Sequence, residues 1–469
     1  MGGLLTAELE RILAETPELE NAYLVGGCVR DWLLGLAPED IDVEVFGLTY
    51  DQLAKVLSRW GATDVVGRSF GVVKLRLPTG QTFDFSIPRR ESKTGPGHTG
   101  FRTAFDPAIT PKEAAARRDY TINALMFDPR SGQVLDFFGG ESDLRHGILR
   151  HTSSAFVEDP LRVLRGMQLA GRFDLKAVPE TLALCREIRG GYHELAVERI
   201  KEEWFKWAAF CRVPSAGLRF LEATGWIEHF PELAALRGVP QDPQWHPEGD
   251  VFTHTCHCCD ALAQMAGWRA ADETSRVVFM MAVLAHDFGK PATTQETIQD
   301  GCKRIVSPGH EPAGGPLAET FLARIGTPRA IIERVVPLVK NHLAHLQTVN
   351  ERFVRRLARR LEPETIEGLC LVITADAFGR PPKPQTVPPG VTELLHLATQ
   401  LRIRDSAPKP ILLGRHLLAV GLPPGPEFGR ILHAAYEAQL DGHFTDLDGA
   451  LSWLSQHETR ATGASRKVP

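Results

Sequence analysis

Acidic residues alternate with apolar ones in the stretch PEDIDVEVFG (38–47), which contains Asp40, Asp42 and Glu44. Alternate residues of a β-strand share one face, so Asp40 and Asp42 would project side by side from a strand with an apolar opposite face. Adjacent carboxylates repel each other. Such a pair is tolerated on a solvated edge strand, or it holds a hard divalent cation, as Mg²⁺ is held in nucleotidyl-transfer sites. The pair alone leaves both interpretations open.

A glycine pair precedes these carboxylates. In LVGGCVRD, Gly26 and Gly27 lie between a strand-like and a helix-like run, and Arg30 follows one turn later. Backbone amides at such a helix N-terminus can approach an anion closely, although a tight turn needs no ligand. A phosphate-binding turn followed by paired carboxylates would hold a metal ion, a triphosphate and an attacking hydroxyl together. Asp84, in TFDFSI, is a candidate third catalytic carboxylate.

A second group of chemically capable residues is rich in histidine. His254 lies in DVFTHTCHCCDAL, His286 and Asp287 in LAHDFGK, and Asp376 in TADAFGR. Neutral imidazole and carboxylate together suit a divalent transition metal or Mg²⁺ that activates water for phosphoester hydrolysis. The stretch CHCC (256–259) does not predict a zinc site. Its cysteines are too close together for the usual zinc framework, and they fall in an expected helix.

The elements that must position these residues change character along the chain. The first 150 residues alternate strand-like and helix-like runs and include the hairpin GVVKLRLPTGQTFDFSI, turning at 78–80. Helical patterns follow from 156 to about 236, and a second all-α block starts near Trp245. A Pro-rich stretch at 377–390 precedes a last helical segment. We therefore expect an α+β head (1–150), a helical neck and body (151–240), a histidine-rich all-α domain (241–380) and a linker with a helical tail (381–469).

Composition is typical of a multidomain cytoplasmic protein. The chain has 469 residues, which is too long for one core, and its eight cysteines show no disulfide-like framework. We expect no membrane segment. A net charge of −5 gives no overall attraction to nucleic acid, so RNA binding must rest on local basic surfaces. One candidate is RFVRRLARRLE (352–362), although such a run is more often a solvated helix face.

Five motifs in order resemble those of the class II tRNA nucleotidyltransferases, the CCA-adding enzymes of the polymerase-β-like superfamily. The motifs are GGCVRD, DIDVEVFG, RRDYTINALMFD (117–128), DFFGGESDLRHGILR (136–150) and EDPLRVLRGMQLAGRF (158–173). Bacterial poly(A) polymerases share this pattern. RRESKTGPGHTGF (89–101) is similar to the flexible loop of the bacterial branch that carries an additional phosphohydrolase domain, and the resemblance continues through that domain.

The resemblance implies a polymerase-β-like head with a small mixed sheet, and it implies roles for single residues. In the head, the resemblance implies that Mg²⁺ is bound by Asp40 and Asp42. The nucleotide would be contacted by Gly26, Gly27, Arg30 and Arg118. The helix after the head would read the base with Asp159, Arg162 and Arg165. The histidine-rich block resembles the HD phosphohydrolases, whose metal pattern here is His254, His286, Asp287 and Asp376. His310 and His342 are similar to extra histidines that some members use around the metal.

The base-reading helix can also be argued from chemistry. Cytosine and adenine each present an exocyclic amine beside a ring-nitrogen acceptor, so one carboxylate and one guanidinium complement both bases, whereas uracil and guanine present the reverse pattern. The structural alternative is that Asp159, before Pro160, caps a helix and pairs with Arg162 at i,i+3. Where the family usually has a further arginine, this chain has Gln168, which leaves that nucleotide contact open.

We therefore expect template-independent addition of C and A residues from CTP and ATP to the 3′ end of tRNA, with Mg²⁺ in the transferase site. The HD site would use Mg²⁺, Mn²⁺, Ni²⁺ or Co²⁺ for phosphoester hydrolysis. A poly(A) polymerase, a CC-only enzyme and an A-only enzyme share the same motifs, so these alternatives stay open. A protein that is chiefly a hydrolase and a non-catalytic RNA scaffold rank lower. The expected assembly is a monomer or a homodimer.

Overall fold

The structure is a computed structural model, and it describes residues 4–38, 40–64, 71–93 and 101–463. The chain forms two compact units, Met1–His229 and Phe230–Pro469, and each is described by itself. The finer division into four domains stays a prediction. Among the described helices, none is long and apolar enough to cross a membrane.

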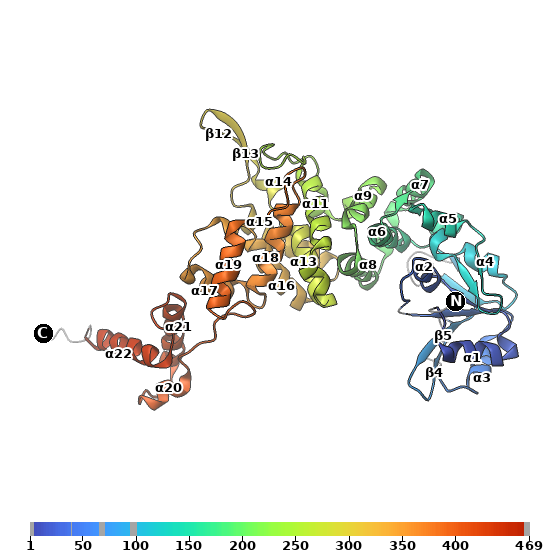
Figure 1. Cartoon of the computed structure of the whole chain (residues 1–469), viewed down its shortest axis with the longest axis horizontal. Coiled ribbons are helices and arrows are strands. Elements are labelled where there is room, and N and C mark those ends of the chain that lie inside the picture. The colour runs from blue at the N-terminus through green and yellow to red at the C-terminus, as the bar shows by residue number, and fades with distance from the viewer. Residues whose placement is uncertain (1–3, 39, 65–70, 94–100, 464–469) are drawn as a thin grey trace. The chain divides into compact units, whose positions relative to one another are not determined.

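A seven-stranded mixed sheet forms the head of the first unit (Figure 1). Its strands in spatial order are β3 (Ala62–Asp64), β4 (Val72–Arg76), β5 (Thr82–Ser86), β2 (Asp42–Val45), β1 (Ala22–Val25), β8 (Met126–Asp128) and β9 (Gln133–Leu135). The pair β2–β5 is parallel, and the other neighbouring pairs are antiparallel. The small mixed sheet expected for a polymerase-β-like head is confirmed.

Short helices accompany this sheet. They are α1 (Ala7–Glu15), α2 (Gly27–Leu33), α3 (Tyr50–Leu57), α4 (Pro111–Ala116) and α5 (Gly140–Arg145). The core beneath them joins apolar residues of α1 and α3 to the inner face of the strands, for example Leu9, Leu53 and Phe85. Burial of these alternating and helically spaced apolar residues fixes the register of the strands that carry the acidic side chains.

The strand with the acidic residues is shorter than the sequence pattern predicts. β2 begins at Asp42, so Asp40 lies in the bend before it and the two do not project from one strand. The strand pairing explains why β2 begins at Asp42, because the first residue of β2 that pairs with β5 is Asp42, opposite Asp84. Within the strand the alternation holds. Val43 and Val45 are fully buried, and Asp42 and Glu44 occupy the other face.

The head contains one hairpin within the sheet and a second one that is separate from it. The predicted turn at 78–80 joins β4 and β5, and Gly80 has a φ of 90°, which suits glycine. The second hairpin pairs β6 (Arg89–Lys93) with β7 (Phe101–Phe105). The predicted flexible loop falls on this second hairpin, and its residues 94–100 lie outside the described ranges.

The rest of the first unit is mainly helical. Its main helices are α6 (Leu161–Phe173), α7 (Pro179–Glu187), α8 (Val197–Phe210) and α9 (Pro214–Thr224), with the 3₁₀ turn η4 (Ser154–Glu158) before α6. Helix α6 packs against both α8 and α9. A Cβ at Gly217 would lie 2.5 Å from the carbonyl oxygen of Met167, so the backbones of α6 and α9 approach each other closely. This packing fixes the faces of α6 and α8 that carry basic residues.

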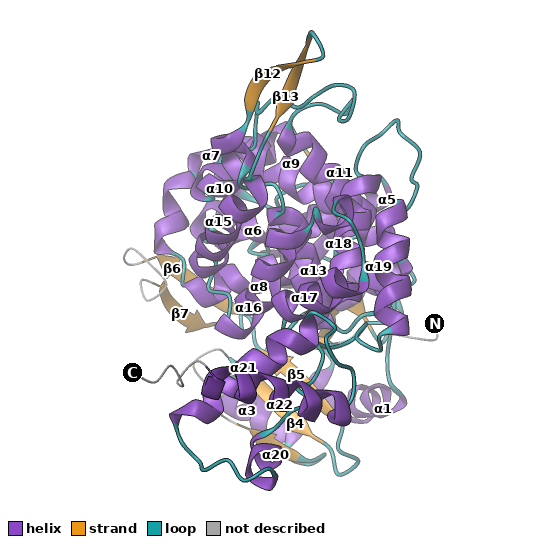
Figure 2. Ribbon diagram, turned by 90° about the vertical axis from the view of Figure 1, so that its left-hand side faces the viewer, coloured by secondary structure: helices purple, strands orange, loops and turns teal. Residues whose placement is uncertain are grey.

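Helices also dominate the second unit (Figure 1). They are α10 (Pro231–Ala234), α11 (Val251–Gln264), α12 (Ala266–Ala270), α13 (Glu273–Ala285), α14 (Lys290–Thr293), α15 (His310–Arg324), α16 (Arg329–Asn341), α17 (Glu351–Leu361), α18 (Ile366–Phe378) and α19 (Pro389–Gln400). The nine residues 277–285 of α13 are all buried, as expected for a helix at the centre of a bundle. A hairpin of β12 (Gln295–Gln299) and β13 (Cys302–Val306) projects from these helices (Figure 2).

The last three helices have a small core of their own. They are α20 (Gly414–Ala419), α21 (Pro426–Leu440) and α22 (Leu447–Gly463), and they bury residues such as Leu417 and Phe444. The arginine-rich run 352–362 lies in α17 and contacts this region. Arg356 donates to Asp441 at 2.7 Å and to Glu437 at 3.0 Å. Much of the run therefore pairs with α21 and its C-terminal end, and is not a free surface for RNA.

Candidate active site and candidate metal centre

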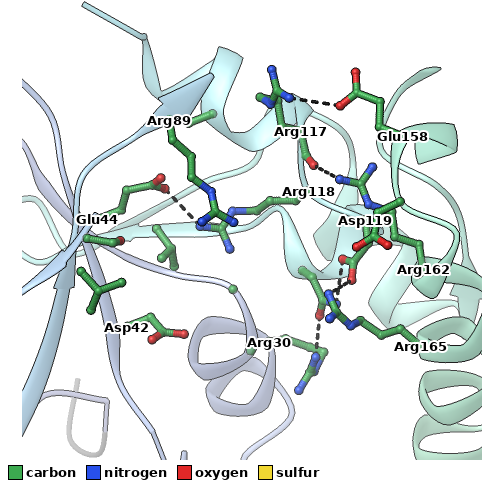
Figure 3. Close-up of a pocket in the computed structure, with 18 of the residues that line it drawn as sticks. Arg30, Asp42, Glu44, Arg89, Arg117, Arg118, Asp119, Glu158, Arg162 and Arg165 are labelled. Carbon is green, nitrogen blue, oxygen red and sulfur yellow. Dashed lines mark hydrogen bonds and ion pairs between the residues drawn. The ribbon is translucent and has the colours of Figure 1, made fainter. Parts of the chain in front are cut away.

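A polar cavity of about 710 Å³ lies in the first unit between the sheet and the helices α6 and α8 (Figure 3). Basic side chains outnumber acidic ones on its walls. The basic residues are Arg30, Arg89, Arg117, Arg118, Arg162, Arg165, Arg199 and Lys206, and the acidic ones are Asp42, Glu44, Asp119, Glu158 and Asp159. A cavity of this size and charge suits a compact polyanion such as a nucleoside triphosphate.

The predicted glycine turn opens onto this cavity. Strand β1 ends at Val25, Gly26 has a φ of 79°, and α2 begins at Gly27. A Cβ at Gly26 would lie 2.9 Å from Nη1 of Arg118. The backbone conformation therefore favours glycine here, and a Cβ would also displace the Arg118 guanidinium. Gly26 and Gly27 both line the cavity.

The acidic residues reach the site from neighbouring strands. Asp42 and Asp84 are directly paired across the parallel strands β2 and β5, and Lys74 Nζ lies 3.2 Å from an Asp84 carboxylate oxygen. Asp42 lines the large cavity, and it shares a smaller one of about 300 Å³ with Asp40 and Asp84. In the part of the chain that the structure describes, these three carboxylates do not all approach within 4.8 Å of one another.

The electrostatics of Asp42 fit a cation site. Desolvation raises the pKa of Asp42; Arg118 opposes this effect, and the carboxylates of Asp84, Asp40 and Glu44 add to it. Carboxylate oxygens are the ligands that Mg²⁺ prefers, and a divalent cation would relieve the repulsion among these groups. The donor set is therefore chemically suited to Mg²⁺.

The two predicted nucleotide-binding arginines of the head are both held by carboxylates. Arg118 donates to Glu44 at 3.1 Å, and its buried Nε has no hydrogen-bond partner. Arg30 is 5% exposed and donates to Asp31 at 2.7 and 2.8 Å. Arg30 therefore lines the cavity as a fixed charge with little freedom to move, whereas Arg118 lies at its wall beside Asp42.

Asp159 caps the start of α6 and also contacts α8, and its role in base reading stays a prediction. One carboxylate oxygen accepts from the Leu161 amide at 3.1 Å, as a helix cap does, and the other accepts from Arg199 at 2.7 Å. The ion pair with Arg162 that the structural alternative proposed is not formed, and Asp159 contacts Arg199 of α8 instead. Arg162 instead donates to the carbonyls of Ala155 and Arg117, at 2.6 and 2.7 Å. Asp159 and Arg162 both line the cavity, and Arg162 lies across it from Asp42 (Figure 3).

Arg165 ties α6 to the head. It donates to Asp119 at 3.0 Å and to Glu203 at 3.4 Å. Burial disfavours its charge, but Asp119 and Glu203 outweigh that effect and raise the pKa of Arg165. One turn further, Gln168 is 4% exposed and is not among the residues that line the cavity. The position where the family usually has an arginine is therefore part of the core here.

Sequence reasoning missed several residues of the cavity, above all Arg199 and Lys206 on α8. The signal was present, because Arg199, Glu203 and Lys206 fall at helical spacing on one face. The spacing does not tell which element that face meets. Arg117 and Asp119 flank the predicted Arg118 and were also missed as cavity residues.

The second unit brings together the six residues predicted for the HD site. They form two groups in which the ligand atoms lie within 4.8 Å of one another: His254, His286 and Asp376 with Cys258, and Asp287 with His310 and His342. They come from α11, the end of α13, the start of α15, the end of α16, and α18. Asp287, His310, His342 and Asp376 also line a cavity of about 390 Å³.

The histidine rings are oriented as metal ligands are. Nδ1 of His286, His310 and His342 each lies 2.7 Å from the backbone carbonyl three residues earlier, so each ring presents an unprotonated Nε2. The Nε2 atoms of His310 and His342 face each other at 3.2 Å, close enough to share a proton or to bind one metal ion. The carboxylate oxygens of Asp287 lie 3.1 Å from Nε2 of His286, 3.4 Å from Nε2 of His310 and 2.7 Å from Nζ of Lys290. These residues fit a bound divalent metal.

Charges around two of these ligands, His342 and Asp287, favour the metal-binding protonation states, whereas at His254 burial disfavours the charged ring but Cys258 and Asp376 raise the pKa above its usual range. Burial and the neighbouring His286 lower the pKa of His342 to about 3, so its ring is neutral. Burial disfavours a charged Asp287, but His286 and Lys290 hold the pKa of that carboxyl well below its usual range. His254 Nδ1 lies 2.7 Å from a Glu248 oxygen, a carboxylate–histidine pair that leaves Nε2 for the metal.

Comparisons with known proteins agree with this architecture. Residues 22–150 match the family described as Poly A polymerase head domain. The multifunctional CCA protein of Xanthomonas campestris is 35% identical over 426 residues, which cover 88% of this chain and 96% of the relative. This chain belongs to the multifunctional CCA protein family. The relative from Nitrosococcus oceani is 34% identical and covers 86% of this chain and 93% of its own length.

Solved structures show the same fold as this multifunctional CCA protein family member. The Bacillus stearothermophilus CCA-adding enzyme in complex with CTP superposes with a TM-score of 0.64 at 19% identity, over 98% of this chain and 100% of that one. The Thermotoga maritima CCA-adding enzyme complexed with tRNA gives 0.57 at 20% identity, over 95% of each chain. The chain is thus a nucleotidyltransferase, and its family indicates dependence on a divalent metal.

Proposed function

We propose that this protein adds C and A residues to the 3′ end of tRNA, using CTP and ATP and no nucleic-acid template. The observation that carries the proposal is the placement of Asp42, paired with Asp84, on the wall of a strongly basic cavity whose opposite wall is the base-reading helix. The relatives named multifunctional CCA protein support it. A poly(A) polymerase, a CC-only enzyme and an A-only enzyme remain the alternatives within this reaction class.

The chain's own residues divide the work of nucleotidyl transfer. The turn at Gly26 and Gly27 and the guanidinium of Arg118 bind the triphosphate. The 3′-hydroxyl of the tRNA then attacks the α-phosphorus, the bond to the bridging oxygen breaks, and pyrophosphate leaves. Asp40, Asp42 and Asp84 would hold Mg²⁺, which when bound neutralises charge on the phosphates and helps deprotonate the attacking hydroxyl.

Base choice is assigned to the start of α6. Asp159 is partly exposed at the cavity and its carboxylate oxygens can each accept more than one hydrogen bond, so it can accept from the exocyclic amine of C or A while Arg199 holds it in place. Arg162 lies on the same helix face, and it is the proposed hydrogen-bond donor to the ring nitrogen. Uracil and guanine would place an acceptor against Asp159, and they are refused.

A direct test offers three tRNA ends to the purified protein: one before CCA, one ending in CC, and one complete. Labelled CTP and ATP are supplied separately and together. Full CCA addition predicts two C residues on the first end with CTP alone and one A residue on the second with ATP alone. Long A tracts on any end would favour a poly(A) polymerase, and no incorporation would refute the transferase proposal.

A second activity, phosphoester hydrolysis at the HD site, is favoured by the clustering of buried histidine and aspartate ligand atoms within 4.8 Å of one another. The cavity in front of them also contains Lys290 and Arg380, whose cations suit a phosphate group. Trp245 at this cavity is 54% exposed, which suits stacking of a nucleobase. We propose nucleotide phosphate esters or 2′,3′-cyclic phosphates as substrates, with Mg²⁺, Mn²⁺, Ni²⁺ or Co²⁺ as the metal.

Hydrolysis is tested with such substrates and each metal in turn, comparing the wild type with a variant in which His286 and Asp287 are both alanine. Loss of hydrolysis in that variant with unchanged nucleotide addition supports two separate sites. A wild type without hydrolysis under every metal would leave the HD region as a structural or RNA-docking module. A cytoplasmic location and a monomeric or homodimeric state stay predictions.

A further inference from the structure

We propose that Cys258 supplies a sulfur ligand to the metal at the HD site, beside His254, His286 and Asp376, so that this position takes a thiophilic transition metal such as Zn²⁺ or Co²⁺. The inference rests on the proposed HD metal site and adds a ligand that the His, His-Asp, Asp pattern does not contain. It also narrows the metal, because thiolate ligands disfavour Mg²⁺.

Helix geometry places the sulfur beside a predicted ligand. His254 and Cys258 are four residues apart on α11, so both project from one face of the helix, one turn apart. The Sγ atom of Cys258 lies 3.3 Å from Nε2 of His254. This is the spacing by which two side chains of one helix share a zinc ion in other metal sites.

The four candidate ligand atoms lie close enough together to share one ion. Ligand atoms of His254, Cys258, His286 and Asp376 all lie within 4.8 Å of one another, and Nε2 of His254 lies 3.1 Å from an Asp376 oxygen. Zinc bonds of about 2.0 to 2.3 Å place tetrahedral ligands about 3.3 to 3.8 Å apart. Little movement is therefore needed for all four to bind one ion.

A second observation favours a cation in this volume. Nδ1 of His286 lies 2.7 Å from the Val283 carbonyl, and Nε2 lies 3.1 Å from an Asp287 carboxylate oxygen, so a neutral ring places two acceptors against each other. A buried acceptor without a donor is costly, and a metal ion would satisfy it. The side chain of His286 is 1% exposed, so bulk water does not substitute for that ion.

The sulfur of Cys258 lies away from the cavity that would hold the substrate. Cys258 and His254 are fully buried and are not among the residues that line the cavity, whereas Asp287, His310 and His342 are. The sulfur therefore lies on the side of the site that is closed to substrate, as protein ligands do in closed zinc sites. The competing explanation is that the thiol only fills space, since it packs tightly against Gly379.

Cobalt spectroscopy separates the two explanations. The full-length protein is stripped of metal and titrated with Co²⁺ in a Cys302→Ser background, which removes the only exposed cysteine of the eight. Three proteins are compared: this background, the same with Cys258→Ser, and the same with Cys256→Ser as a control on the same helix. Bound cobalt is counted by elemental analysis, and circular dichroism checks that each variant is folded.

A cobalt–thiolate bond gives a charge-transfer absorption in the near ultraviolet. We expect this band in the background and in the Cys256→Ser protein, and its loss in the Cys258→Ser protein, together with an affinity for cobalt lower by about tenfold or more. A background protein that binds cobalt without the band would overturn the sulfur ligand and leave the HD site standing. Failure to bind any cobalt would instead refute the HD metal site itself.

A second measurement does not depend on the variant folding. X-ray absorption of the zinc-loaded background protein should show one sulfur at about 2.3 Å among nitrogen and oxygen ligands. A zinc environment made of nitrogen and oxygen alone would refute the proposal.

Discussion

Replacing Asp159 by asparagine tests how the protein chooses bases. The structure makes this change more informative than alanine, because the oxygen that caps Leu161 at 3.1 Å can be kept while the other carboxylate oxygen becomes an amide donor. That second oxygen accepts from Arg199 at 2.7 Å and faces the cavity. The variant therefore retains the helix cap and removes the acceptor for the exocyclic amine of C and A.

The size of the effect follows from the bond that is lost. A hydrogen bond to a charged acceptor contributes about 1.5 to 3 kcal/mol, and about 1.4 kcal/mol corresponds to a factor of ten. Discrimination between CTP and UTP should fall about ten- to 150-fold in Asp159→Asn. Asp159→Ala should lose the same discrimination, and about 1 kcal/mol of stability as well, because the cap is lost too.

The assay measures kcat/KM for CTP and for UTP on a tRNA that ends before CCA, in the wild type and both variants. Glu198→Ala, an exposed change beside Arg199 on α8, serves as the control and should behave as the wild type. If both Asp159 variants keep the wild-type ratio, Asp159 is a helix cap and the base is read elsewhere.

Three further predictions concern the two sites. Asp42→Ala should abolish nucleotide incorporation, and wild-type turnover would refute the role of Asp42. The substitution should not lower the melting temperature, because the pKa of Asp42 is raised in the folded state and its charge therefore opposes folding at neutral pH. Because the raised pKa belongs to the metal-free site, protons should compete with Mg²⁺ there, so the Mg²⁺ concentration needed for half-maximal incorporation should rise as the pH falls; a Mg²⁺ requirement that stays constant down to pH of about 4 would contradict this. Trp245→Ala should raise KM for nucleotide hydrolysis and leave kcat nearly unchanged, which steady-state kinetics will show.

Local sequence patterns predicted most of the elements that carry the site. The glycine turn before α2, the hairpin of β4 and β5, and the helix α6 all follow from alternation, helical spacing and turn residues. The first residue of strand β2 was not predicted correctly. Asp40 continues the alternation, but no strand pairs with it, and pairing depends on residues far away in the sequence.

The remaining gaps have the same cause. Arg199 showed its spacing along α8 but not that its face lines the cavity with α6. From the sequence, the basic run at 352–362 was a candidate RNA-binding surface or a solvated helix face, whereas in the structure acidic groups such as Asp441 pair with it. Cys258 was set aside because cysteines alone do not form a zinc framework there, while its proximity to His286 and Asp376 depends on the packing of α11, α13 and α18.

The most direct measurement is the 3′-end sequence of a tRNA without CCA after incubation with the wild-type protein, Mg²⁺ and all four nucleoside triphosphates. CCA-adding activity predicts that the added residues are C, C and A, in that order, with growth ending there. An unchanged end, an A tract, or the incorporation of U or G would contradict the proposed function.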